Sequence, residues 1–255
     1  MSDVASVAGW IAAAGHVTVL TGAGISTDSG IPDYRGPNGV WTKDPAAERQ
    51  ATIDAWVSDP DLRRDAWQFR VGNRGRRIEP NDGHRALVEL ERLGRLDVLI
   101  TQNVDGLHLE AGHEPHRVIE VHGTIREVQC LRCGDRQPTS VVLDRVAEGE
   151  VDPHCLDCGG LLKSGTISFG QSLNPVDIEG ADEAARSTDV FLALGTSLAV
   201  YPVALLPQYA AASGARVVII NAEPTAQDSL AHVVINDGLG AVLPALVAEV
   251  EVRLA

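Results

Sequence analysis

The chain has 255 residues, of which 44% are hydrophobic and 4% aromatic, so it can bury a sizeable core of mainly aliphatic side chains. Its formal net charge of −14 disfavours direct binding to nucleic acid and attracts basic partners, although on its own such a charge is better explained as keeping the protein soluble. No apolar run of about 20 residues is present, which excludes a membrane-spanning helix, and no signal peptide is recognisable before Gly9. We therefore expect a cytoplasmic protein.

Helix and strand patterns alternate from the start of the chain. Residues 4–14 have apolar spacing typical of a helix, and residues 17–20 form a β-branched, apolar run that predicts a buried strand. A glycine turn follows at residues 22–24, and residues 25–30 look like the opening of a helix. Residues 32–45 are rich in Pro, Gly and Asp, which predicts a loop.

The alternation continues through the rest of the chain. Further helices are predicted at residues 52–71, 83–93, 202–212 and 239–252, and strands at residues 96–100, 117–121, 190–194, 217–220 and 233–235. Strands that alternate with helices predict an α/β fold, a Rossmann-like doubly wound parallel sheet. Ligands bind such sheets beyond the carboxyl ends of the strands. We therefore expect five strand tips to meet at one edge: Gly22–Gly24, Gln102–Asp105, His122, Gly195–Ser197 and Asn221–Glu223.

The glycine turn is the first candidate binding element. Gly22 and Gly24 would let the backbone approach a pyrophosphate. The third glycine of the usual dinucleotide fingerprint is absent because Thr27 stands there, and no acidic residue ends a second strand about 20 residues on, so an ordinary NAD dehydrogenase is disfavoured. A tight turn without a ligand is the alternative. Arg35 favours the ligand, because it supplies a cation beside the candidate phosphate site.

Four cysteines form two close pairs, Cys130-x-x-Cys133 and Cys155-x-x-Cys158. Two such knuckles complete a tetrahedral, all-thiolate site of the closed, structural type, which predicts bound Zn²⁺. Two local disulfides or a redox-active pair are the alternatives, and the cytosolic setting and the doubled spacing disfavour both. His154 stands beside Cys155 as a fifth candidate and is expected to be a bystander.

His122 is the candidate general base. It follows a short apolar run and precedes Gly123, and a histidine whose pKa lies near 6.5 can accept a hydroxyl proton at neutral pH. A lone histidine is more often structural, but Asn103 and Asp105 at a neighbouring strand tip could bind a carboxamide and a ribose. The other histidines show no comparable setting, and His84 is expected on a helix face.

Together these motifs resemble the sirtuin family of NAD-dependent protein lysine deacylases, of the bacterial type. Seven matching segments occur in the order of the family and cover nearly the whole chain: Gly22–Ser26, Gly30–Arg35, Thr101–His108, His122–Gly123, the two cysteine pairs, Gly195–Leu198 and Asn221–Glu223. The predicted organisation is an NAD-binding domain at residues 1–36, 77–124 and 163–255, a loop and helical insert at residues 37–76, and a four-cysteine zinc-binding module at residues 125–162.

The resemblance implies a role for individual residues. His122 would be the proton acceptor, and Asn103 and Asp105 would act with it in the nicotinamide pocket. Residues that resemble the family's NAD contacts are Gly22, Ala23, Gly24, Ser26, Thr27, Tyr34, Arg35, Gln102, Asn103, Val104, Asp105, Gly195, Thr196, Ser197, Asn221, Ala222, Glu223 and Leu239. Substrate contacts would be Ile167, Phe169 and Gly170, where an acyl-lysine peptide adds by β-augmentation and Phe169 forms one wall of the acyl-lysine tunnel.

The reaction implied by the resemblance consumes NAD as a co-substrate. The acyl oxygen of the modified lysine attacks the nicotinamide ribose, nicotinamide leaves, and the base helps a ribose hydroxyl to take over the acyl group. The products are free lysine, nicotinamide and O-acyl-ADP-ribose. We expect protein or peptide acyl-lysine substrates, structural Zn²⁺, no membrane partner and a monomer. Rival classes are a protein mono-ADP-ribosyltransferase on the same scaffold and a non-catalytic NAD-binding module.

Three positions depart from the family pattern. Tyr34 replaces the commoner Phe, and Gln171 stands where many members have Glu, so a charged contact to the peptide is in doubt. Trp67-x-x-Arg70 falls where desuccinylating members carry Tyr-x-x-Arg. The alternative interpretation is a Trp on a core face with a solvated Arg. Deacetylation is therefore the first prediction, and removal of acidic acyl groups is a hypothesis.

Overall fold

The computed structural model describes residues 2–255, so Met1, the first residue of the predicted NAD-binding domain, lies outside the described part. Its main sheet has six strands, all parallel, in the order β3-β2-β1-β7-β8-β9, which confirms the predicted α/β class. The strands are Val17–Thr21 (β1), Val98–Thr101 (β2), Val118–Glu120 (β3), Val190–Leu194 (β7), Arg216–Ile220 (β8) and Val233–Ile235 (β9).

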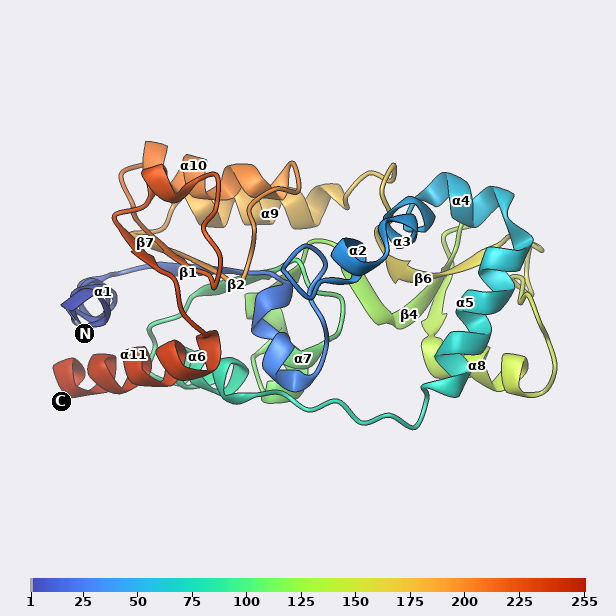
Figure 1. Cartoon of the computed structure of the whole chain (residues 1–255), viewed down its shortest axis with the longest axis horizontal. Coiled ribbons are helices and arrows are strands. Elements are labelled where there is room, and N and C mark those ends of the chain that lie inside the picture. Colours follow the sequence, from blue (N-terminus) through green and yellow to red (C-terminus); the bar gives the residue numbers. More distant parts are fainter. Residues whose placement is uncertain (1) are drawn as a thin grey trace.

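Helices cover both faces of this sheet (Figure 1). One face carries α1 (Ser2–Ala13), α6 (Asp82–Arg92) and α11 (Leu239–Leu254), and the other carries α9 (Pro175–Arg186) and α10 (Leu206–Ala212). Successive strand residues point to opposite faces, so neighbours such as Val19 and Leu20 are fully buried in two separate cores. This double burial explains the unbroken apolar runs of the strands. Within residues 2–255, no helix combines the length and the apolar character needed to cross a membrane.

A second, antiparallel sheet of three strands forms the other end of the molecule (Figure 1), in the order β5-β4-β6. This sheet packs with several helices around a third core, which includes Trp56 and Trp67. The strands are Gly123–Cys130 (β4), Arg136–Pro138 (β5) and Leu162–Thr166 (β6), and the helices are Ile53–Ser58 (α4), Pro60–Gly72 (α5) and Thr139–Ala147 (α8). The shorter helices are Val40–Lys43 (α2), Pro45–Gln50 (α3) and Leu107–Ala111 (α7).

The prediction that residues 25–30 open a helix is wrong. The chain makes two single 3₁₀ turns there, Ala23–Ile25 and Thr27–Ser29. The Asn81 side chain donates a hydrogen bond of 2.7 Å to the carbonyl of Ile25, and Gly30 turns the chain with a φ of 84°. The Ile25 carbonyl is therefore paired with a distant side chain instead of with a helical N–H group. No local sequence pattern predicts that contact.

Other helix boundaries also differ from the prediction. Residues 52–71 form two helices, because Pro60 has no N–H to donate and the Asp59 side chain caps the second helix. The predicted loop at residues 32–45 contains the single turn of α2. Neither α8 nor α9 was predicted. The cap of α9 is visible in the sequence, since Asn174 accepts from the backbone N–H of Val176.

The strand order reverses between β1 and β7, and the two strand tips meet there backbone to backbone. The Gly24 N–H donates to the Gly195 carbonyl at 2.8 Å, and the Gly22 N–H donates to Leu194 at 3.0 Å. A Cβ added to Gly24 would lie 2.7 Å from the Gly195 Cα. The glycine turn is therefore required by packing between two loops, in addition to any contact with a ligand.

We expect Gly24→Ala to lower the Tm by about 4–8 °C. An overpacked methyl group costs about 2 kcal/mol, and each kcal/mol corresponds to about 2–4 °C at this chain length. Gly238→Ala is the matched control, because its Cβ would meet open space and its φ is −71°. Circular dichroism during heating measures both. Equal Tm values for Gly24→Ala and the parent would contradict the packing argument.

Candidate active site

A cleft of about 1980 Å³ opens at the carboxyl edge of the six-stranded sheet, where the strand order reverses. All five predicted strand tips contribute to its wall. The predicted residues that line it are Gly22, Ala23, Gly24, Thr27, Tyr34, Arg35, Gln102, Asn103, Val104, Asp105, His122, Ile167, Phe169, Gly170, Gly195, Thr196, Ser197, Asn221, Ala222, Glu223 and Leu239. The structure thus brings residues from distant parts of the sequence to one cavity.

Ser26 is the one residue of the predicted NAD site that does not line the cleft. It is 1% exposed and lies behind the wall, where its hydroxyl donates to Asp105 Oδ2 at 2.7 Å and accepts from Asn103 Nδ2 at 3.1 Å. Asn103 Nδ2 also donates to the carbonyl of Gly22. Because its amide nitrogen is committed to protein acceptors, Asn103 can present its carboxamide oxygen to a ligand. Ser26 therefore acts by orienting two neighbouring polar side chains.

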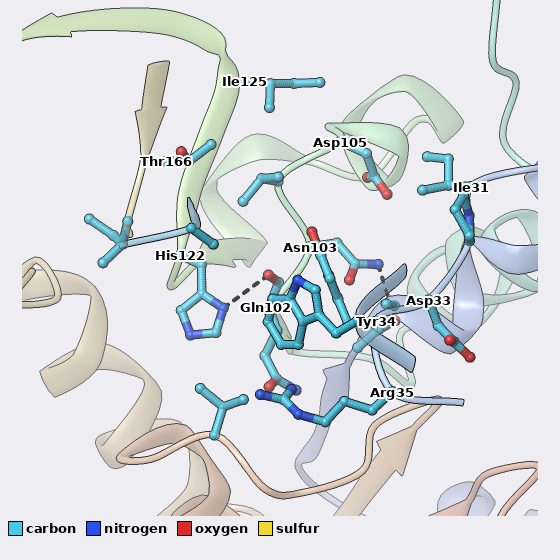
Figure 2. A pocket seen from close by; sticks show the side chains of 18 of the residues that line it. Ile31, Asp33, Tyr34, Arg35, Gln102, Asn103, Asp105, His122, Ile125 and Thr166 are labelled. Carbon is cyan, nitrogen blue, oxygen red and sulfur yellow. Dashed lines mark hydrogen bonds between the residues drawn. The ribbon is translucent and has the colours of Figure 1, made fainter. Parts of the chain in front are cut away.

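His122 is oriented by the main chain of the neighbouring strand tip. Its Nδ1 lies 3.0 Å from the Gln102 carbonyl, as Figure 2 shows by a dashed line. A carbonyl oxygen only accepts, so Nδ1 carries the proton and Nε2 is the free acceptor of the neutral ring. Burial lowers the pKa of His122, and the bond to Gln102 only partly offsets this. The imidazole is therefore neutral at pH 7 and able to take a proton.

Gln102 and Thr196 connect two strand tips across the cleft wall. The Gln102 side-chain nitrogen donates to Thr196 Oγ1 at 2.9 Å, and its backbone N–H donates to the carbonyl of Thr21. Thr196 Oγ1 also accepts from the N–H of Leu198 at 3.3 Å. The tips of β1, β2 and β7 are thus joined by hydrogen bonds among residues that line or adjoin the cleft.

Arg35 lies in the loop between β1 and α2, and its side chain extends into the pocket (Figure 2). Its guanidinium carbon is 4.4 Å from the ring centroid of Trp41, and an Nη atom is 3.5 Å from a carboxylate oxygen of Glu48. Trp41 also contacts Tyr34, with centroids 4.6 Å apart, and Phe169, at 5.5 Å. Trp41 lines the cleft, although the sequence analysis did not single it out. It joins the Arg35 loop to the segment that carries Phe169.

At the β8 end of the cleft, the backbone is held by side-chain amides. Asn221 Nδ2 donates to the carbonyl of Glu223 at 2.6 Å, and Asn236 Nδ2 donates to the carbonyl of Asn221 at 3.0 Å. Leu239, the first residue of α11, closes this end and is 6% exposed. These contacts hold the Glu223 backbone in a defined turn beside the cavity.

The sequence analysis missed a buried cluster of three histidines behind the site. The ring centroids of His84 and His108 are 4.9 Å apart, and those of His108 and His113 are 5.5 Å apart. Burial lowers the pKa of all three, that of His84 to about 4. His108 Nε2 lies 3.0 Å from Thr21 Oγ1, so the cluster contacts the end of β1. Helices α6 and α7 bring these rings together, and no spacing in the sequence predicts that.

The four cysteines form one cluster at the end of β4 and in the turn before β6. Their sulfur atoms all lie within 4.8 Å of one another, and two of the separations are 3.5 Å (Cys130–Cys158) and 3.8 Å (Cys133–Cys155). These distances are far longer than a disulfide bond of about 2.05 Å. A tetrahedral zinc site with Zn–S bonds of about 2.3 Å requires sulfur separations of about 3.8 Å. The donor set therefore fits structural Zn²⁺, with no position left for water.

His154 is not a member of this sulfur cluster. Its Nδ1 lies 3.0 Å from the carbonyl of Gly159, and its Nε2 lies 4.0 Å from a carboxylate oxygen of Asp152. Asp152 is bound by Arg63 of α5, with an N–O distance of 2.8 Å, in an ion pair whose side chains are 8% and 15% exposed. This ion pair fastens the cysteine-bearing turns to the helical insert.

Two cations, the half-buried Arg70 and the buried Lys163, line the cleft next to the three-stranded sheet. Lys163 is 3% exposed, and its Nζ donates to the carbonyl of Ser164 and to both oxygens of Thr166. Arg70 donates to Ser164 Oγ at 3.2 Å and lies over the rings of Trp56 and Trp67. Burial lowers the pKa of both side chains, and the charge of Arg70 helps to lower that of Lys163 to about 8.

Neither cation has a carboxylate partner within residues 2–255; their hydrogen-bond acceptors are neutral. Trp67 is fully buried, as the core interpretation of the Trp67-x-x-Arg70 motif requires. Arg70, however, is not a solvated surface residue, because it lines the cleft. Trp67 is therefore a core residue, whereas Arg70 lines the cavity.

A doubly wound parallel sheet with a cleft at its switch point, together with a separate four-thiolate cluster, defines the class: a nucleotide-binding α/β protein with a structural metal module. The model of the Sir2 family matches residues 22–202. A Streptomyces coelicolor protein named NAD-dependent protein deacetylase 2 is 50% identical over 230 residues, which cover 90% of this chain and 95% of that protein.

Solved structures agree with the sequence match. A Sir2 structure solved to study enzyme mechanism and regulation superposes with a TM-score of 0.88 at 39% identity, covering 100% of this chain and 99% of the other. A Sir2 complex with a p53 peptide and NAD⁺ gives a TM-score of 0.84 at 30% identity, covering 97% and 98%. The chain therefore belongs to the Sir2 family, which confirms the resemblance to sirtuins.

We expect Cys130→Ser to abolish stoichiometric Zn²⁺ binding and to unfold the three-stranded end of the molecule, because ligation contributes folding free energy. Plasma mass spectrometry measures zinc per chain, and limited proteolysis locates the unfolded segment. Ser140→Ala, an exposed position on α8, serves as the control. A parent protein that contains no zinc and yet resists heat and protease would refute the assignment.

Proposed function

We propose that this chain is an NAD-dependent protein lysine deacetylase that transfers the acetyl group of a modified lysine to ADP-ribose and releases nicotinamide and free lysine. Membership of the Sir2 family and the name of the Streptomyces coelicolor relative support this activity. The proposal rests above all on the neutral imidazole of His122, which lines a cleft at the switch point of a parallel sheet.

The size of the cleft fits two ligands. Sites for single small molecules occupy about 300–1,000 Å³, and this cleft measures about 1980 Å³. When bound, NAD supplies the ADP-ribosyl group that receives the acetyl group. We assign its phosphates and riboses to the tips of β1, β7 and β8, with Arg35 as the nearby cation, and its nicotinamide to Asn103 and Asp105. Ser26 contributes by orienting these last two side chains.

In the proposed reaction, His122 accepts the proton of a ribose hydroxyl at Nε2. The second nitrogen, Nδ1, donates to Gln102 before and after the transfer, so the ring keeps its orientation when it becomes charged. Asn103 and Asp105 would hold the carboxamide of the departing nicotinamide. The lowered pKa of His122 keeps the acceptor form populated at neutral pH.

We assign the acyl-lysine peptide to the segment at residues 167–170. The N–H and carbonyl of Phe169 are already paired with Ala51 and Ile53, at 3.1 and 2.9 Å, so an added strand would pair with neighbouring residues such as Gly170. Phe169 would form one wall of the acyl-lysine tunnel. Gln171 uses its side-chain oxygen to accept the N–H of Ser168 at 2.9 Å, which gives it a local role in place of a charged contact.

The remaining assignments rest on sequence and composition. We propose a cytoplasmic monomer that acts on protein substrates and does not bind nucleic acid directly, because the net charge of −14 opposes a polyanion. We propose that residues 37–76 form the helical insert, that residues 125–162 form the zinc module, and that the rest of the chain forms the NAD-binding domain.

We expect His122→Ala to lower kcat/KM for an acetyl-lysine peptide by about 10²–10⁴-fold, the usual contribution of a general base, with an unchanged Tm. Mass spectrometry of nicotinamide, O-acetyl-ADP-ribose and deacetylated peptide measures the reaction. The parent enzyme should lose activity on acidification with a midpoint below pH 6.5, because burial lowers the pKa of the base.

His116→Ala is the matched control for this substitution, because His116 is exposed and lies outside the cleft. It should retain parental turnover. Near-parental activity of His122→Ala would refute the role of the base. A protein that gains ADP-ribose while the peptide stays acetylated would instead identify the chain as an ADP-ribosyltransferase.

A second candidate activity is the removal of acidic acyl groups such as succinyl. The half-buried Arg70 and the buried Lys163 favour it, because both line the cleft and neither is neutralised by a carboxylate of residues 2–255. A buried charge without a counter-ion is costly, and a carboxylate on the acyl group would relieve that cost. Trp67 supplies no hydroxyl group, so recognition would rest on the two cations.

If acidic acyl groups bind there, Arg70→Met should lower kcat/KM for a succinyl-lysine peptide by about 10–100-fold, the value of a charge-assisted hydrogen bond, and change acetyl-lysine turnover less than threefold. Arg77→Met, at an exposed position, is the control. Succinyl-lysine and acetyl-lysine peptides of one sequence are compared by mass spectrometry. A parent enzyme without desuccinylase activity would dispose of the idea.

A further inference from the structure

Leu198 is the one non-glycine residue of residues 2–255 with a positive φ, which is 53°. A side chain in this left-handed region crowds the following carbonyl, so the conformation persists only where the surroundings hold it. The Leu198 side chain is 3% exposed and packs in the core between the sheet and α9 and α10. It directly follows Gly195–Ser197, the β7 tip that lines the cleft. A strained residue therefore supports one wall of the cavity.

Gln227 holds this residue in place. Its side-chain nitrogen donates to the carbonyl of Leu198 at 3.3 Å and to the carbonyl of Ala204 at 2.7 Å, and the residue is 8% exposed. The two acceptors lie at the two ends of the segment that leads from the β7 tip toward α10. A single amide group thus ties that segment together from the inside.

The loop that carries Gln227 is itself fixed. The backbone N–H of Gln227 donates to Thr225 Oγ1 at 3.2 Å, and Thr225 donates to Asp228 Oδ1 from its N–H at 3.1 Å and from its hydroxyl at 2.6 Å. The same loop begins at the β8 tip, where Asn221–Glu223 lines the cleft. Gln227 therefore joins the tips of β7 and β8, the two tips to which the phosphate and ribose of the adenosine half are assigned.

We propose that Gln227 is a positioning residue for the adenosine half of NAD. It does not line the cleft; it acts by holding Leu198, whose N–H in turn donates to Thr196 Oγ1. This inference rests on the proposed function and names a determinant of NAD affinity within it. The two acceptors are carbonyl oxygens, so only a side chain that donates can hold them. A side chain with the shape of Gln227 but without N–H groups could therefore not hold the two carbonyl oxygens.

Two substitutions separate the amide donor from the side-chain shape. Gln227→Met keeps the length and removes the donor, and Gln227→Glu keeps the shape and leaves only acceptors facing two carbonyl oxygens. Gln208→Met on α10 is the matched control, because Gln208 is exposed. Gln227→Met decides the matter if Gln227→Glu does not fold, because it places no charge in the buried site.

The experiment measures ADP-ribose binding by calorimetry, together with kcat, the KM for NAD, the KM for an acetyl-lysine peptide and inhibition by nicotinamide. In both Gln227 variants we expect the Kd for ADP-ribose and the KM for NAD to rise about tenfold, as for the loss of one buried hydrogen bond. The kcat, the peptide KM and the nicotinamide inhibition constant should stay within about twofold, because the nicotinamide pocket lies at the tip of β2. The Gln208→Met control should match the parent throughout.

Two outcomes would overturn the inference alone: unchanged ADP-ribose binding in a folded Gln227→Met protein, or an equal loss in kcat, peptide KM and NAD KM, which marks a general structural defect. Failure of the parent to bind ADP-ribose would overturn the proposed function, and this inference with it. The parent measurement therefore tells the two failures apart.

Discussion

The hydrogen bond between the Gly24 N–H and the Gly195 carbonyl joins the tips of β1 and β7 at the point where the strand order reverses. Only a residue without a Cβ allows this approach, since a methyl group on Gly24 would lie 2.7 Å from the Gly195 Cα. The β1 tip leads to Ser26 and through it to Asn103, and the β7 tip leads to Thr196 and through it to Gln102. The position of the whole polar wall depends on this backbone contact.

The two sides of the cleft differ in how their polar groups are satisfied. On the sheet side, Ser26 is hydrogen-bonded to Asp105, Asn103 to the Gly22 carbonyl and Gln102 to Thr196, and such a connected network holds its members in one geometry. On the side of the three-stranded sheet, the acceptors that Arg70 and Lys163 find in the described part of the chain are all neutral. A rigid, hydrogen-bonded wall suits reaction steps that need a fixed base, and uncompensated cations suit selection of the acyl group.

Sequence patterns predicted the fold where the signal is local. Val190–Leu194 and Val233–Ile235 have the predicted bounds, because apolar runs between turn formers have few other structures open to them. The predicted helix after the glycine turn is wrong because Asn81, more than 50 residues away, bonds the carbonyl of Ile25 at 2.7 Å. The helix at Thr139–Ala147 was missed because the turn formers around the cysteines dominate that region. Contacts between distant residues account for the first of these errors, and mixed local signals account for the second.

By itself, the sequence predicted which side chains would carry chemistry: the paired cysteines, the glycine turn, the amide and acid at residues 103 and 105, and His122. These are recognisable because each is a short motif whose spacing has a local physical cause. The tertiary structure alone decided how those groups are used. It assigns the Nδ1 proton of His122 through the Gln102 carbonyl and places Ser26 behind the cleft wall, and it gives Arg70 and Lys163 no counter-ion from residues 2–255. Each of these depends on which distant atoms come within a few ångströms, and only packing determines that.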